Sequence, residues 1–261
     1  MNNLNVFRIF AFALVLFFLA TALAPVPAVA AAPPPPRPVP QLRSIPIPGL
    51  NSRNDSLPWT VLILFTVLTL LPALLLSMTP FVRILLVFHF LRQALGTQTA
   101  PTNQTLLGLA LFLTYFVMQP VAVLINKASI EPFEAGSITA WQAVERSADP
   151  IRNFMLKYTR EKDLALFVEM SHEPRPSRPE DLSIRVVAPA YIISELKTGF
   201  QIGAVLYLPF LVIDMVVAAI TTSIGMFQLP PVVISTPLKI LLFVVADGWN
   251  LVVGSTIKSF F

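Results

Sequence analysis

Cysteine is absent from the 261-residue sequence, and histidine occurs only twice. Without cysteine there is no disulfide framework, no thiolate metal site and no cysteine nucleophile. His89 and His172 are too far apart to form the i, i+4 pair that binds a metal on a helix, and no glycine-rich loop is present to hold a phosphate. No spacing of serine, histidine and aspartate proposes a catalytic triad. We therefore predict no enzyme activity, no cofactor and no metal site.

Charge is also scarce. Only 12% of the residues are charged, whereas charged residues make up about 25% of a typical soluble domain. Apolar residues account for 55% of the chain, and the mean hydropathy is +0.73, so the composition predicts a membrane protein. The net charge is +4, and the basic residues are scattered along the chain. They form no basic patch of the kind that binds nucleic acid.

The first 30 residues have the layout of a secretory signal peptide. Arg8 precedes the apolar run 9–20, and Ala28-Val29-Ala30 fits a small-residue cleavage site. We predict cleavage near Ala30 and Ala31. The alternative is that this segment is retained as a first membrane helix.

A proline-rich stretch follows this signal. The prolines between residues 33 and 48 lack an N–H and fix φ, which excludes a helix or a central strand. Residues 31–56 are therefore predicted to be an extended or disordered periplasmic spacer.

The rest of the chain is organised as apolar stretches around one polar segment. The apolar stretches are 57–78, 79–97, 105–126, 199–227 and 232–257. We group them into a first helical hairpin region (57–126) and a second one (188–261), separated by a polar helical insertion (127–187). The predicted fold class is an all-α membrane protein of long helical hairpins broken by proline and glycine.

An orientation follows from the signal peptide and the basic residues. If the N-terminus is exported, four crossings return the C-terminus to the outer side, and the insertion lies on the periplasmic side. Arg83, Arg92 and Lys239 then lie at the cytoplasmic ends of the hairpins, in agreement with the positive-inside rule.

The polar insertion has apolar residues at helical spacing. Asp149 is predicted to cap a helix in which Pro150 occupies the first helical position. Its charged face is interpreted as a solvated surface, and contact with neighbouring subunits is the alternative.

Charged residues interrupt the second hairpin region. A carboxylate in the middle of a span costs about 2.5–3.5 kcal/mol by insertion scales, yet Glu195, Lys197 and Asp214 lie in or beside an apolar run. Glu195 and Asp214 would be about 28 Å apart along a helix, which is too far for shared acid–base work. Lys239 and Asp247 are placed on neighbouring faces of one helix. Such charges are typical of a protein interior in which they pair.

Several stretches resemble the FliP family, a core subunit of the flagellar protein-export gate, and its counterparts in virulence type III secretion. They include polar residues that hydrophobicity alone does not predict. They are "RQALGTQTAPTNQTLLGLALFLTYFVMQPV" (92–121), "FMLKYTREKDLALF" (154–167), "APAYIISELKTGFQIG" (188–203), "LPFLVIDMVVA" (208–218) and "STPLKILLFVVADGWNLVVGS" (235–255).

The resemblance implies a ring of several copies with FliQ- and FliR-like subunits in the bacterial inner membrane. The family assembles into an oligomeric cone of hairpins in the flagellar basal body, with a pore that passes unfolded flagellar proteins. The charged residues are then expected to support assembly by pairing within or between chains. These residues are Arg83, Arg92, Glu195, Lys197, Asp214, Lys239 and Asp247.

The resemblance also places a pore-lining turn at 222–231. Family members carry a methionine-rich run there that acts as a flexible gasket, and thioether side chains suit that task because they repack readily. Gly225 and Met226 match the pattern, whereas Phe227 and Gln228 depart from it. The alternative is a turn that only connects two helices.

Other functions remain open at this stage. An export-gate subunit of a virulence secretion system is the nearest alternative. A secondary transporter is the next, because proline-broken helices with central charges also describe transporters, and a structural membrane anchor is the third. The signal peptide and the long N-terminal extension favour the flagellar system.

Overall fold

The computed structural model describes residues 57–97, 99–171, 178–226, 228 and 230–261. The described residues form helices and contain no strand, which confirms the all-α fold class. The helices are α2 (Leu57–Ser77), α3 (Phe81–Ala94), α4 (Asn103–Ile125), α5 (Glu131–Glu134), α6 (Ala140–Tyr158), α7 (Glu161–Ser171), α8 (Ile184–Ser223), α9 (Pro231–Val245) and α10 (Gly248–Lys258), with the π-helical turn η1 (Asn126–Ile130) and the 3₁₀ turn η2 (Pro179–Asp181). The predicted signal peptide and spacer, with Ala30 and Ala31, lie outside the described residues.

The chain divides into two units at Leu68. The described part of the first unit is the beginning of α2, where large apolar side chains such as Leu64 and Phe65 are exposed. The second unit, 69–261, holds every other element and is described from here on.

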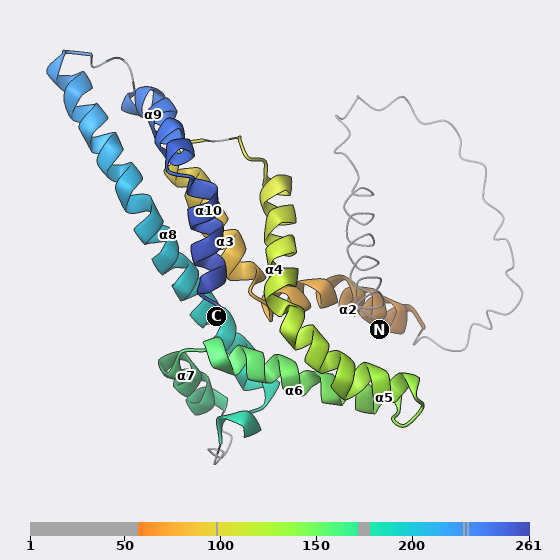
Figure 1. The fold of residues 1–261 in the computed structure, drawn as a ribbon. Helices are drawn as coiled ribbons and strands as arrows, with labels where there is room; N and C mark the ends of the chain where they lie inside the picture. The colour runs from red at the N-terminus through yellow and green to blue at the C-terminus, as the bar shows by residue number, and fades with distance from the viewer. Residues whose placement is uncertain (1–56, 98, 172–177, 227, 229) are drawn as a thin grey trace, which may run out of the picture. The chain divides into compact units, whose positions relative to one another are not determined.

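Helix α8 organises the second unit. It is 40 residues long, about 60 Å at 1.5 Å per residue, which is twice the thickness of a bilayer's hydrocarbon core. It packs against α3, α6, α7 and α9. Figure 1 shows α9 alongside its C-terminal part and α7 near its N-terminal end. The sequence places the long apolar segment at 199–227, whereas the helix already begins at Ile184.

The described residues include helices with the length and composition of membrane spans. Two qualify singly: residues 103–134, in which α4, η1 and α5 are continuous, and α8 itself. Two bent pairs, 61–77 with 81–94 and 231–245 with 248–258, bring the number to four if each pair is one span.

The core lies between α3 and α8. Apolar residues of α3 recur at three- and four-residue intervals, so they share one face, and Ile84, Val87, Phe88 and Leu91 are at most 1% exposed. The other side of the contact is a small-residue position on α8. A Cβ at Gly203 would lie 2.3 Å from Cδ2 of Phe90, so only glycine accommodates this ring.

Helix α6 begins earlier than the sequence predicts. Its N-cap is Thr139, which forms a capping box with Gln142, and the helix continues through Asp149 and Pro150. The prediction of an N-cap at Asp149 is therefore wrong. The reciprocal side-chain bonds of the capping box satisfy two backbone N–H groups at the true start, and the proline is accommodated inside the helix.

A second correction concerns the last apolar stretch. Helix α9 ends at Val245 and α10 begins at Gly248, with a bend of 67° between them. Asp247 occupies this break with φ of 50°, in the left-handed region that an aspartate tolerates better than most residues. Lys239 and Asp247 consequently do not lie on one helix, and the interpretation that they occupy neighbouring faces is wrong.

Candidate functional site

Three ion pairs along α8 bring together most of the charged residues singled out in the sequence. The first joins Arg83 of α3 to Glu195 of α8. The guanidinium Nε donates to Glu195 Oε2 at 2.8 Å, and Nη2 donates to the other carboxylate oxygen. Both residues are buried, Glu195 completely. This two-point geometry fixes the register of α3 against α8.

Residues from distant parts of the chain cover the Arg83 guanidinium. The Phe260 ring lies 4.0 Å from its central carbon, and Nη1 donates to Ser259 Oγ at 3.1 Å. Tyr158 of α6 donates its hydroxyl hydrogen to the Phe260 carbonyl, and the two rings meet edge to face. The cluster therefore ties α3, α6, α8 and the C-terminal residues together.

The second ion pair docks the insertion on α8. Asp163 of α7 accepts hydrogen bonds from Ser194 Oγ at 2.8 Å and from Lys197 Nζ. Burial acts to raise the pKa of this carboxyl, but the hydrogen bonds from Lys197 and Ser194 outweigh it and hold the pKa below its ordinary value. Ser194 Oγ also accepts from the backbone N–H of Arg160 at 3.0 Å.

The third ion pair joins the two helices of the second hairpin. Lys239 Nζ of α9 donates to Asp214 Oδ2 of α8 at 2.5 Å and to the Ala94 carbonyl of α3 at 3.1 Å. Ser235 Oγ donates to Asp214 Oδ1 at 2.6 Å. The lysine is 2% exposed, whereas the Asp214 side chain is 25% exposed. A buried cation is thus held by three helices.

The remaining predicted charges lie elsewhere. Arg92 donates to the Asn103 side-chain oxygen and to the Pro101 carbonyl, so it fastens the connection between α3 and α4. Asp247 is exposed, and within the described residues its carboxylate accepts a hydrogen bond only from Asn250 Nδ2, at 3.1 Å. It belongs to none of the three ion pairs.

The described residues of the turn between α8 and α9 are exposed on the surface of the chain. Gly225 has φ of 82°, a conformation that glycine adopts without strain. Met226 and Gln228 are exposed, and Met226 is 39% exposed. Phe227 lies outside the described residues, and the role of this turn as a pore seal stays a prediction.

Sequence reasoning missed several partners in these clusters. Asp163 resembles the other acidic residues of the insertion, and Tyr158 and Phe260 are ordinary aromatics by sequence. Ser235 was detectable in principle, because it is a polar residue in an apolar stretch, and the structure shows it fully buried. The described residues contain no group of three or more side chains that could hold a metal.

These features define a multi-helix membrane protein in which the buried charges of the described residues pair between helices. The particular family follows from its relatives. The sequence pattern of the FliP family matches residues 64–256. The chain is 48% identical over 227 residues to the flagellar biosynthetic protein FliP of Pectobacterium carotovorum subsp. carotovorum, which covers 85% of this chain and 86% of that protein.

Two further relatives agree. The flagellar biosynthetic protein FliP of Bacillus subtilis (strain 168) is 48% identical over 207 residues, covering 79% of this chain and 94% of that protein. That of Aquifex aeolicus (strain VF5) is 43% identical over 202 residues, covering 77% and 84%. The chain belongs to the FliP family, as its resemblance predicts.

Proposed function

We propose that the chain is a core subunit of the flagellar protein-export gate in the bacterial inner membrane. Several copies assemble with FliQ- and FliR-like subunits into a cone, and its pore passes unfolded flagellar proteins out of the cytoplasm. Membership of the FliP family carries this proposal. The relatives described above are named as flagellar proteins, which favours the flagellar system over its virulence counterpart and over a transporter.

The ion pairs suit a structural role in such a gate. Each neutralises a charge inside the chain, so the helices do not have to expose it to lipid. Large apolar side chains on α8 and α9, such as Val205, Met215 and Val233, are more than half exposed. Exposed apolar surface of this extent is typical of contact with lipid or with neighbouring subunits, and the proposed assembly supplies both.

In the proposed gate, Met226 and Phe227 seal the closed pore. They lie at the turn between two long apolar helices, beside Gly225 and ahead of Pro230. Apolar side chains exclude water and ions by dewetting and still yield to a passing chain.

The test is the double variant Met226→Ala/Phe227→Ala, with Val144→Ala/Leu166→Ala, which truncates two exposed apolar side chains of the polar insertion, as the matched control. We expect the first to assemble normally on a native gel and to make cells leaky to small solutes, and the control to assemble and remain tight. An assembled Met226→Ala/Phe227→Ala variant that is as tight as the parent would show that the seal lies elsewhere.

A further inference from the structure

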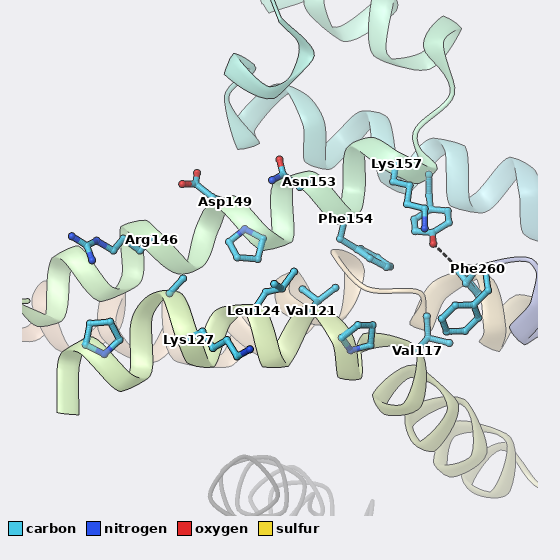
Figure 2. A pocket seen from close by; sticks show the side chains of 16 residues that line it. Val117, Val121, Leu124, Lys127, Arg146, Asp149, Asn153, Phe154, Lys157 and Phe260 are labelled. Carbon is cyan, nitrogen blue, oxygen red and sulfur yellow. Dashed lines mark hydrogen bonds between the residues drawn. The ribbon is translucent and has the colours of Figure 1, made fainter. Parts of the chain in front are cut away.

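A groove of about 790 Å³ lies between α6 and the continuous helix formed by α4, η1 and α5. Figure 2 shows Val121 and Leu124 of α4 and Phe154 of α6 between these two helices. Leu124 is 55% exposed. The groove therefore has an apolar floor that is open at the surface.

Basic side chains surround this floor. Lys127 comes from η1, while Arg146 and Lys157 come from α6, and all three are exposed. Within the part of the chain that the structure describes, none of them pairs with a carboxylate. Asp149 is the one acidic residue of the lining, and it accepts a hydrogen bond from Arg152 at 2.7 Å. The groove thus has an excess of positive charge.

The groove lies at one end of a candidate membrane span. That span comprises residues 103–134, about 48 Å of helix, of which about 20 residues suffice to cross the hydrocarbon core. Val121 and Leu124 of the floor belong to its C-terminal half, and Lys127 follows where the apolar run ends. Phe133 and Trp141 are exposed close to this end in the sequence, and exposed aromatic residues are typical of the membrane–water interface.

We propose that this groove binds one anionic phospholipid. An acyl chain lies along Val121, Leu124 and Phe154, and the phosphate lies near Lys127. Arg146 and Lys157, about 16 Å apart along α6, add positive charge toward the two ends of the groove. An amphiphile with one negative charge complements both features at once, because the floor removes apolar surface from water and the cations attract the headgroup. The site concerns the isolated chain and does not depend on its export role.

The test uses the purified full-length chain in neutral detergent. Native mass spectrometry measures retention of phosphatidylglycerol, with phosphatidylcholine as the neutral-headgroup comparison. We expect the parent to prefer phosphatidylglycerol. The triple variant Lys127→Gln/Arg146→Gln/Lys157→Gln should weaken that binding at least about tenfold, because each cation near a membrane surface contributes to the attraction.

The matched control is Lys162→Gln/Arg178→Gln/Arg185→Gln, which removes three exposed cations that do not line the groove. It should bind phosphatidylglycerol within about twofold of the parent, since these cations lie away from the proposed headgroup position. Equal loss in both triple variants, or no loss in either, would overturn the proposal. All six cations are exposed, so gel filtration should give the parent's profile for both.

Two further measurements distinguish other occupants. Ala128→Phe fills the groove while keeping its cations, and it should also lose phosphatidylglycerol. If this variant keeps the lipid, or if inorganic phosphate displaces the lipid from the parent, the site recognises phosphate alone and the proposal fails. A photo-crosslinking amino acid at Leu124 should capture lipid in membranes, and capture of a second copy of the chain would overturn the proposal.

Discussion

Arg83 shows how a single cation can be kept in an interior. Its two hydrogen bonds to Glu195 neutralise the charge. Its Nη1 donates a third hydrogen bond to Ser259 Oγ, and the Phe260 ring covers the guanidinium face. A buried charge that loses its partner is costly, whereas removing both charges is often neutral. Losing one member of the pair is therefore expected to destabilise the fold strongly, because the other charge would remain buried without a partner.

We expect Glu195→Ala to lower the free energy of unfolding by about 3–5 kcal/mol, because it leaves the guanidinium buried without its carboxylate. The double variant Arg83→Met/Glu195→Leu should recover much of that loss. Denaturant unfolding of the detergent-solubilised chain measures both values. A double variant that loses as much stability as Glu195→Ala, or more, would contradict a coupled pair.

The Asp163 carboxyl gives the insertion a defined response to acid. Its pKa is lower in the folded chain than in the unfolded one. In an unfolded chain, the pKa of an aspartate is about 3.9. The unfolded state therefore binds the proton more readily, so the stabilisation is full above about pH 4–5 and is lost as the pH falls through the folded-state pKa. Because Lys197 is half exposed, solvent screening reduces the size of this contribution.

The measurement is the thermal midpoint of the parent minus that of Asp163→Asn, followed from pH 7 down to about 3. We expect a constant difference at the neutral end and a shrinking one below about pH 4. A difference that grows on acidification would contradict the lowered pKa. Subtracting the variant removes the titration of the other carboxylates, which both proteins share.

From the sequence, one can identify the charged residues whose burial is energetically unfavourable, but not the residues that pair with them. Glu195 and Asp214 stand out because insertion of a carboxylate into an apolar run is unfavourable. Arg83 is 112 positions from Glu195, and only the packing of α3 on α8 brings the two together. Asp163 carries no local signal of its role, because its burial results from α7 lying on α8.

Helix α8 combines two environments in one element. Its first half carries Ser194 and Lys197, which contact α7 of the polar insertion, and its second half carries Asp214, which contacts α9. A helix of about 60 Å has room for both, because a bilayer's hydrocarbon core takes up about half of that length.

We expect Gly203→Ala to destabilise the chain by about 1–3 kcal/mol, because the added methyl group would overlap the Phe90 ring and force the α3–α8 contact to open. Gly108→Ala on α4 is the control. Its Cβ would have no neighbour within 4 Å, so alanine's better helix propensity should leave stability unchanged or raise it by up to about 1 kcal/mol. Thermal unfolding in detergent compares the two, and equal effects would contradict the steric explanation.

The presence of the long apolar helices was predictable from the apolar runs. The residues at which helices begin and end were not. The start of α6 depends on a capping box at Thr139, which competes with the equally plausible Asp149-Pro150 signal. The break before α10 depends on Asp247 adopting a positive φ. An aspartate in an apolar run does not predict that backbone conformation.

At the scale of the whole molecule, Lys239 connects the adjacent helices α8 and α9 to α3, where its contact Ala94 lies 145 positions away in the sequence. It contacts Asp214 of α8 and the Ala94 carbonyl of α3 from its own position on α9. The second hairpin is thereby fixed to the first hairpin region, and an assembly of several copies needs each copy to hold this arrangement.

We expect Asp214→Ala to reduce the amount of assembled complex on a native gel more than Lys239→Ala does. Loss of the carboxylate strands an almost fully buried ammonium group, whereas loss of the lysine leaves a partly exposed carboxylate that Ser235 still contacts. Motility of cells carrying each variant reports export in parallel. Normal assembly with lost export would contradict the structural role and indicate a direct one in transport.

The cover over Arg83 has a consequence for how the chain is made. Ser259 follows Arg83 by 176 positions, and at the roughly 5–20 residues per second of protein synthesis the interval between them is about 9–35 s. During translation the nascent chain therefore carries this cation without its aromatic cover, even after Glu195 has been added. The cluster can therefore close only after Phe260 has been synthesised.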